Sequence, residues 1–365
     1  MVPGRFEGVN EFKPGLEGVV AFETEIAEPD KEGGALRYRG VDIEELVGKV
    51  PYEKVWGLLV DDSFDPGMPR AEDLQLRART GSAMADLQAA TAELGGLWSL
   101  GQLIDITDEQ ARDDLARVSA GMISLVAQSA RGESPRVPDE QVAEGDIAAE
   151  RFLLRWRGEA DPRHVRAVDS YWVSAAEHGA NASTFTGRIV ASTGADCGAA
   201  MSAAVGALSG PLHGGAPTRV LKMLDEVEQA GDVEQYVRDL LDRGERIMGF
   251  GHRVYRAEDP RARVLRRTAH ELESPRVEVA EALENAALEE LRARHPERVL
   301  ATNVEFWSAV VLDIADIPPP LFPAMFACAR VAGWSAHILE QKRSGRLIRP
   351  SAKYVGPASR SLESV

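Results

Sequence analysis

Residues 195–219, ADCGAAMSAAVGALSGPLHGGAPTR, carry the structural signal from which the rest of the chain can be interpreted. Residues 195–209 are mainly Ala, Gly and Ser, a composition that allows unusually close packing of a helix in a core or a subunit interface. Glycines then flank His213, and they permit a positive φ or the close approach of a ligand. Pro217 suits the first turn of a further helix. The stretch therefore predicts two helices joined by a loop that leaves the His213 ring accessible.

Helical spacing of alanine and leucine recurs along most of the chain, and strand-like alternation is confined to residues 16–27 and 35–40. This pattern predicts a mostly α-helical fold with a small N-terminal β element. Asp259 followed by Pro260 is a helix start, with an N-cap acceptor and a proline fixed at helical φ. The helices that we expect cover residues 41–46, 52–60, 72–94, 111–128, 146–157, 162–177, 218–227, 233–243 and 261–272.

The composition excludes several classes of partner. The 365 residues carry a formal net charge of −16, which repels nucleic acids and anionic membranes. The sequence shows neither a secretory signal nor an apolar run long enough to span a membrane, so a cytoplasmic location is expected. Cys197 and Cys328 stand among small apolar residues without metal or disulfide spacing, which indicates buried thiols.

A rigid break at residues 316–323, DIPPPLFP, divides the C-terminal half. With the loop at His213, it predicts a large helical domain made of residues 1–219 and 319–365. Residues 220–318 are then expected to form a small domain.

Four stretches combine reactive polar groups with glycine or a helix start: AEHGANAST, GPLHGGAPT, IMGFGHRVYRAEDPRAR and ATNVEFWSA. None has the spacing of a zinc site, a serine nucleophile elbow or a dinucleotide fingerprint. What remains is general acid–base chemistry by histidines and a carboxylate, with arginines to bind anions. Arg261, in the first turn of the helix that Asp259 caps, lies where the backbone already favours anions. Such a set suits proton removal next to a carbonyl group.

These motifs resemble those of the citrate synthases. The run GFGHRVYRAEDPR at residues 249–261 is similar to the family signature almost position for position, and EHGANAST, GPLHGGA and RLIRPSAKYVGP occur in the family's order. The resemblance covers essentially the whole chain. It implies a homodimer of two-domain helical subunits that condenses oxaloacetate with acetyl-CoA and hydrolyses citryl-CoA. It also implies that acetyl-CoA is a substrate and that neither a metal nor a redox cofactor is needed.

The resemblance also assigns roles to individual residues. His213 would hydrogen-bond the thioester carbonyl and stabilise the enol, His252 would polarise the ketone of oxaloacetate, and Glu305 would be the catalytic base. The remaining assignments are oxaloacetate binding by His178, Asn181, Arg261, Arg330 and Arg349, with Arg349 reaching the partner subunit's site, and coenzyme A binding by Arg256, Gly249 and Gly251.

One position departs from the family pattern, because the family's base is an Asp and this chain has Glu305. The extra methylene could displace the carboxylate by about 1 Å, a misplacement that costs on the order of 10²-fold in rate. Asn303 is expected to cap the helix that begins beside Glu305, where backbone amides favour the ionised carboxylate. Two alternatives stay open: a 2-methylcitrate synthase that uses propionyl-CoA, and a non-catalytic binder of acyl-CoA and oxaloacetate.

Overall fold

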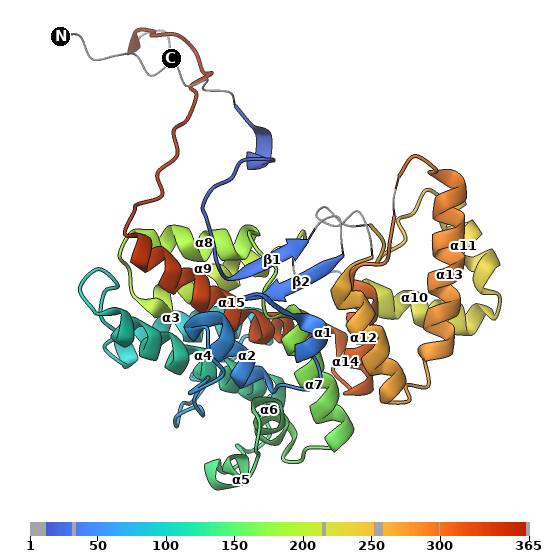
Figure 1. The fold of residues 1–365 in the computed structure, drawn as a ribbon, viewed down its shortest axis with the longest axis horizontal. Helices are drawn as coiled ribbons and strands as arrows, with labels where there is room; N and C mark the ends of the chain where they lie inside the picture. Colours follow the sequence, from blue (N-terminus) through green and yellow to red (C-terminus); the bar gives the residue numbers. More distant parts are fainter. Residues whose placement is uncertain (1–11, 31–33, 214–216, 252–257, 299, 363–365) are drawn as a thin grey trace.

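The computed structural model describes residues 12–30, 34–213, 217–251, 258–298 and 300–362. A small sheet precedes a series of helices that make up the body of the molecule (Figure 1). The strands are β1 (Ala27–Asp30), β2 (Ala35–Tyr38) and β3 (Val41–Asp42). The helices are α1 (Ile43–Leu46), α2 (Tyr52–Asp61), α3 (Ala83–Leu97), α4 (Asp108–Arg131), α5 (Asp139–Ala143), α6 (Ala148–Arg157), α7 (Pro162–Ala175), α8 (Ala182–Ser192), α9 (Cys197–Leu208), α10 (Pro217–Ala230), α11 (Val233–Asp242), α12 (Pro260–Glu271), α13 (Val277–Arg294), α14 (Val304–Ile314) and α15 (Phe322–Ser344).

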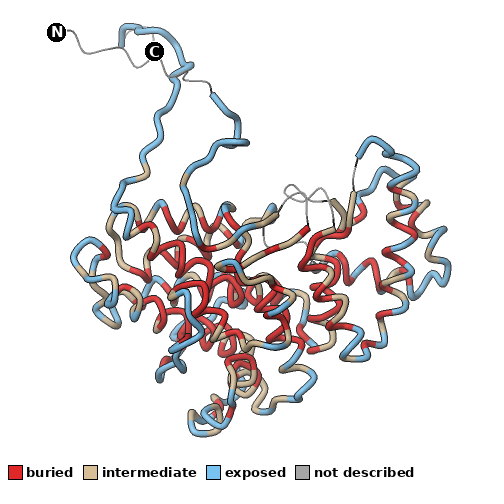
Figure 2. The backbone as a smooth tube through the Cα atoms, viewed as in Figure 1, coloured by how far each residue is buried: buried red, intermediate tan, exposed pale blue. Residues whose placement is uncertain are grey.

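The sheet is antiparallel in the order β1-β2-β3, and Ala27 lies opposite Tyr38. Tyr38 is buried, and its hydroxyl is shared between the carbonyls of Val173 and Ser174, at 3.1 Å each. The sheet thus holds the C-terminal end of α7. The strand expected at residues 35–40 is confirmed. The strand expected at residues 16–27 is wrong. Its first part leaves the body exposed and has no neighbouring strand to share hydrogen bonds (Figure 2). Phe22 and Ile26 then pack on the body through their side chains, and the strand β1 begins only at Ala27.

Helix α15 is the central element of the core. It packs against α2, α4, α7, α8 and α9, and most of its residues are buried on every side. Gly333 lets α15 come close to the chain at the end of α7, because a Cβ there would lie 2.6 Å from the carbonyl oxygen of Ala176. The close packing expected for residues 195–209 is also confirmed. Helix α9 packs against α3 and α8, and a Cβ at Gly206 would lie 2.5 Å from Nε2 of Gln88.

Helices α10 to α14 form the other side of the molecule in Figure 1, where α11 and α13 pack together and α10 contacts both. Helices α12 and α14 pack against each other, and each also packs against α7. They therefore connect this group of helices to the rest of the chain. The division into domains at residues 220 and 319 stays a prediction.

Most of the expected helices are present, with one clear error. Residues 72–82 were expected to begin a helix that runs to residue 94, but α3 starts only at Ala83, where Ser82 accepts a hydrogen bond from the Ala85 amide. Before that cap the chain bonds to other elements instead, and the Leu76 amide donates to the side chain of Gln128. Tertiary hydrogen bonds have overridden helical spacing here.

The Asp259–Pro260 start of α12 and the Asn303 cap of α14 are confirmed. Cys197 and Cys328 are buried free thiols, as expected. Within the described ranges, every helix is too short or too polar to cross a lipid bilayer.

Candidate active site

A pocket of about 180 Å³ lies where α7, α12, α14 and α15 meet the loop before α8 and the residues after α9. It gathers side chains that are more than a hundred residues apart in sequence. The predicted site residues that line it are His178, Asn181, His213, Arg261, Glu305 and Arg330. Other residues complete its wall: Tyr171, Ala175, Asn303, Val304, Ser308 and Phe326.

The other predicted residues that the structure describes do not line this pocket. Arg349 is exposed on the C-terminal segment, which extends away from the body of its own chain (Figure 1). His252 and Arg256 lie outside the described residues. Gly249 and Gly251 stand behind the wall, and their backbones have φ values of 91° and 83°.

These two glycines join the GFG and ATN motifs. The Gly251 amide donates to the Ala301 carbonyl at 2.7 Å, and the Asn303 amide donates to the Gly249 carbonyl at 2.9 Å. A Cβ at Gly249 would lie 2.9 Å from two carbons of Phe306, so packing as well as positive φ requires glycine there. The pairing fixes the start of α14 and hence the position of Glu305.

Asp259 connects the starts of α12 and α14. Its carboxylate accepts from the Arg261 amide at 3.0 Å, which caps α12, and from the Val304 amide at 3.1 Å. The same carboxylate holds the Arg261 guanidinium through Nε at 3.0 Å and a terminal nitrogen at 2.8 Å. Both side chains are buried. Arg261 is therefore held in one orientation at the edge of the pocket.

Arg330 supplies the second buried positive charge. Its Nε donates to the Ala175 carbonyl at 3.0 Å, and its guanidinium lies over the Phe326 ring, 4.8 Å from the centroid. Within the part of the chain that the structure describes, no carboxylate forms an ion pair with it. Burial lowers the pKa of Arg330, although Glu177 opposes this effect and Arg261 adds to it. A buried guanidinium without a paired carboxylate favours the binding of an anion.

His213 is neutral in this environment. Burial lowers its pKa to about 4, and the positive charge of Arg330 contributes. A neutral ring can still donate a hydrogen bond, which is the role that the resemblance implies for His213. The Nε2 atom lies 2.9 Å from the hydroxyl of Ser183, and the ring meets Phe326 edge to face.

Ser183 connects His213 to the rest of the site. Its hydroxyl accepts from Nε1 of Trp334 at 3.2 Å and donates to Oδ1 of Asn181 at 2.9 Å. Oδ1 also accepts from the Thr184 amide as the N-cap of α8. The Ser183 hydroxyl has only one proton. While the hydroxyl donates this proton to Asn181, the hydrogen bond between His213 and Ser183 must use a proton on Nε2 of His213. If the hydroxyl turns to His213, it donates to Nε2 and leaves Nδ1 as the ring's donor.

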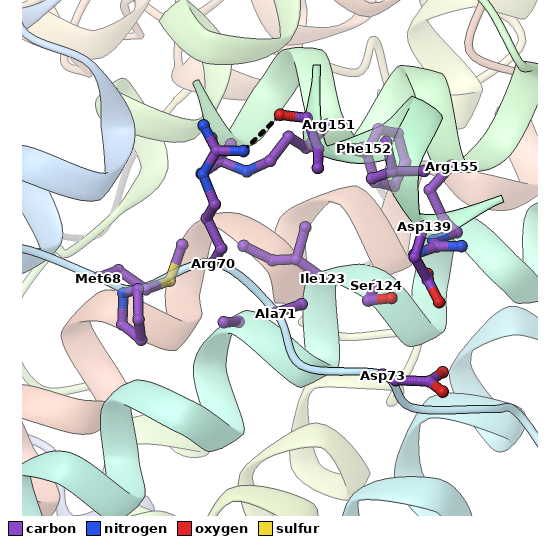
Figure 3. Close-up of a pocket in the computed structure, with 15 residues that line it drawn as sticks. Met68, Arg70, Ala71, Asp73, Ile123, Ser124, Asp139, Arg151, Phe152 and Arg155 are labelled. Carbon is purple, nitrogen blue, oxygen red and sulfur yellow. Dashed lines mark hydrogen bonds and ion pairs between the residues drawn. The ribbon is translucent and has the colours of Figure 1, made fainter. Parts of the chain in front are cut away.

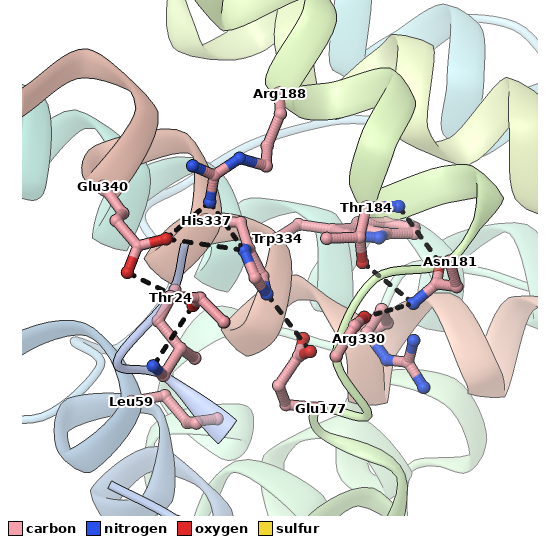
Figure 4. A network of polar contacts seen from close by, with 12 residues as sticks. Thr24, Leu59, Glu177, Asn181, Thr184, Arg188, Arg330, Trp334, His337 and Glu340 are labelled. Carbon is pink, nitrogen blue, oxygen red and sulfur yellow. Dashed lines mark hydrogen bonds and ion pairs between the residues drawn. The ribbon is translucent and has the colours of Figure 1, made fainter. Parts of the chain in front are cut away.

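The loop that carries His178 and Asn181 is fixed by a buried polar network (Figure 4). Arg188 donates to Nδ1 of His337 at 2.9 Å, which assigns the ring proton to Nε2, and Nε2 donates to Glu177 at 3.2 Å. Burial alone would raise the pKa of Glu177, but His337 and Arg330 outweigh it and hold the pKa below its ordinary value. The Gly333 amide also donates to the Ala176 carbonyl.

Glu305 is positioned by the first turn of α14, where its amide donates to Oδ1 of Asn303 at 3.0 Å. The expectation that this turn would favour the ionised carboxylate is wrong in its net effect. Burial raises the pKa of Glu305, and the charge of Asp259 adds to the shift while Arg261 opposes it. Desolvation therefore outweighs the helix terminus. A carboxylate with a raised pKa is a stronger base once it is ionised.

Sequence reasoning missed several residues of this site. Ser183 stands two residues after Asn181, so the cap itself was a usable signal. Phe326 precedes Arg330 by one helical turn, and Tyr171 precedes Ala175 in the same way. Glu177 and His337, by contrast, lie 160 residues apart, and no local pattern pairs them. Among the described residues, no group of three potential metal ligands gathers.

Known proteins show the same architecture. The family model described as citrate synthase, C-terminal domain, matches residues 15–351. A Mycobacterium tuberculosis protein named "Putative citrate synthase 2" is 62% identical over 97% of this chain and 95% of its own length. The citrate synthase of Haloferax volcanii is 37% identical over 95% of this chain and 96% of its own.

A solved structure supports the same relationship. The ternary complex of Thermoplasma acidophilum citrate synthase with carboxymethyl coenzyme A and oxaloacetate superimposes with a TM-score of 0.82, at 28% identity, over 96% of this chain and 98% of that one. Fold and comparisons together define an acyltransferase of the condensing class. The chain belongs to the citrate synthase family.

Proposed function

We propose that this enzyme condenses oxaloacetate with acetyl-CoA and hydrolyses the resulting citryl-CoA to citrate and coenzyme A. The observation that carries the proposal is one pocket that combines two buried arginines, two histidines and a carboxylate of raised pKa. The Thermoplasma relative, crystallised with oxaloacetate and a coenzyme A analogue, supports the assignment of the substrates.

Oxaloacetate carries two carboxylates, and the pocket offers Arg261 and Arg330 to bind them. A planar guanidinium can give a carboxylate two parallel hydrogen bonds. Arg330 has no paired carboxylate among the described residues, whereas Arg261 already holds Asp259 and can share only its remaining donors. His178 and Asn181 line the same wall. We assign the polarisation of the ketone to His252.

Glu305 is the proposed base for the methyl group of acetyl-CoA. Its ionised carboxylate takes one methyl proton. The electron pair of that C–H bond forms the carbon–carbon double bond of the enolate, and the π pair of the carbonyl group moves to the thioester oxygen. His213 donates a hydrogen bond to this oxygen, as a neutral ring can. If Nε2 of His213 accepts a hydrogen bond from Ser183, the ring must carry its proton on Nδ1 in order to donate to the thioester oxygen. The enol carbon then bonds to the ketone carbon, whose oxygen receives a proton from His252, and water cleaves the thioester.

The proposed enzyme uses neither a metal nor a redox cofactor, because proton transfer and hydrogen bonding suffice for each of these steps. Acetyl-CoA is a substrate. We assign its coenzyme A portion to Arg256 and to the backbone around Gly249 and Gly251. Glycine is also required at these positions for structural reasons, because both have positive φ values and Gly249 packs tightly on Phe306.

The proposed functional unit is a homodimer. Both terminal segments leave the body and are exposed along most of their length (Figure 2). Their exposed apolar residues include Val20, Leu347 and Tyr354. Exposed apolar groups on extended arms are typical of surfaces that a partner covers. Arg349 lies on the C-terminal arm, outside the pocket of its own chain, and we assign it to the partner subunit's oxaloacetate.

Release of free coenzyme A in the presence of oxaloacetate tests the proposal. We expect acetyl-CoA to give a higher kcat/KM than propionyl-CoA, with citrate as the product. One methylene changes binding in a pocket by about 1 to 3 kcal/mol, so the ratio of the two kcat/KM values is measurable. A higher value for propionyl-CoA would make the enzyme a 2-methylcitrate synthase. Oxaloacetate binding without any thiol release would make it a non-catalytic binder.

A further inference from the structure

A second cavity, of about 160 Å³, lies between the loop at residues 68–73 and helices α4, α5 and α6 (Figure 3). It shares no lining residue with the candidate active site. Its inner wall is apolar and includes Ile123 of α4 and Phe152 of α6, both buried. The substrates of the proposed reaction give this cavity no role.

The lining of the cavity contains more arginines than carboxylates. Its two carboxylates are already paired: Asp139 with Arg155, and Asp73 with Arg136 at 2.7 Å. Arg70 and Arg151 occupy the other end of the cavity in Figure 3.

Among the described residues, only one of these two arginines has a carboxylate partner. Arg70 donates to the carbonyl of Ala143, and within the described part of the chain it forms no ion pair. Arg151 donates to the carbonyl of Asp146 at 2.6 Å and forms an ion pair with Glu53 at 3.5 Å, so the two guanidinium groups have one carboxylate between them. Burial lowers the pKa of Arg151, and the charge of Arg70 contributes while Glu53 opposes. An anion between the two guanidinium groups would relieve this repulsion.

We propose that this cavity is a ligand site for a small monocarboxylate with an apolar body, such as an aromatic ring or a branched chain. The carboxylate lies between Arg70 and Arg151 and accepts charge-assisted hydrogen bonds from both. The body packs on Ile123 and Phe152. An apolar cavity of about 150 Å³ in another protein holds benzene, so a single ring fits this one.

Benzoate is a suitable probe because it combines one carboxylate with one ring. Isothermal titration of the full chain is carried out with oxaloacetate present, so that the active-site arginines are occupied. We expect one benzoate site per chain with Kd of roughly 0.1 to 1 mM, as a ligand of this size allows. Benzyl alcohol, which lacks the charge, and acetate, which lacks the ring, should each bind at least about tenfold more weakly.

Two variants locate the site. Arg70 has an exposed backbone position on a loop, so Arg70→Gln should fold normally and bind benzoate at least about tenfold more weakly. Ala143→Trp should fill the entrance and abolish binding. Arg77→Gln, a change of an exposed arginine outside the cavity, is the matched control and should bind like the parent. Absence of benzoate binding to the parent, or equal binding by the parent, Arg70→Gln and Ala143→Trp, would overturn the proposal. Neither result would bear on citrate formation.

Discussion

Glu305 shows how one residue's environment decides its chemistry. The sequence placed it correctly in the first turn of α14, but the turn's effect on its charge is outweighed by burial. Burial depends on the packing of α14 against α12 and α7, and no local pattern reports that packing. Glu305 shares its pocket with Ser308 and Val304, and the effect of its extra methylene on the rate stays a prediction.

The raised pKa of Glu305 predicts the acidic limb of the pH profile. The base works only when ionised, so kcat/KM should fall as pH decreases through a pKa above the ordinary glutamate value. Glu305→Asp should retain measurable activity, with its acidic limb shifted if the shorter carboxylate meets a different degree of burial. A measured limb at or below the ordinary value of about 4.3 would contradict the burial argument.

His213 is predicted to act in catalysis more than in folding. Its ring makes one hydrogen bond with Ser183, which keeps its bonds to Asn181 and Trp334 when the ring is removed. His213→Ala should therefore lower the free energy of unfolding by only about 1 kcal/mol. The lost donor should lower kcat by roughly 10² to 10³. Denaturant unfolding and steady-state kinetics on one preparation check this, and a large loss of stability with little loss of kcat would make His213 a core residue.

At the scale of helices and loops, the loop between α7 and α8 shows which contacts could not be predicted from the sequence alone. Helix α7 was predictable from its periodicity, and so was the Asn181 region as a site, whereas α8 was not among the expected helices. The hydrogen-bonded link from Glu177 through His337 to Arg188 was not predictable, because His337 on α15 is far in the sequence from both other residues. The shape of the loop, and therefore the placement of His178, depends on this link.

This element yields a test by substitution at His337. His337→Leu leaves the buried carboxylate of Glu177 without its side-chain donor, and such a loss costs on the order of 3 to 5 kcal/mol. His337→Gln can accept from Arg188 and donate to Glu177, so it should recover most of that stability and keep KM for oxaloacetate close to the parent value. If KM is the same in a folded Leu variant, the network does not position the loop.

At the scale of the whole molecule, the mostly helical fold was predictable because small and apolar residues recur at helical spacing. The expected N-terminal strand at residues 16–27 failed because alternation marks a strand only where a neighbour can pair with it. The arms at both ends are exposed, and in the proposed homodimer they would contact the partner subunit. The role of Arg349 also has to be considered for the whole molecule, because Arg349 does not line the pocket of its own chain.

A complementation experiment tests the shared site. Arg349→Ala and His252→Ala should each be nearly inactive as homodimers. In a mixed dimer, one site combines His252 with Arg349 of the other subunit, so subunit exchange should restore part of the activity. Mass spectrometry of differently tagged subunits confirms exchange. Mixed dimers that form and stay inactive would show that each chain uses its own Arg349.

Proton removal from the acetyl-CoA methyl group by Glu305 is the central claim, and isotope exchange measures it directly. With a non-reacting analogue of oxaloacetate in deuterated buffer, the parent enzyme should incorporate deuterium into the methyl group without forming a carbon–carbon bond. Glu305→Gln keeps the size and the hydrogen-bonding capacity but cannot accept the proton, and it should fold at least as stably because a buried charge is removed. We predict that exchange by the Gln variant is slower by about 10² to 10⁴. Exchange at the parent rate would remove Glu305 from the mechanism.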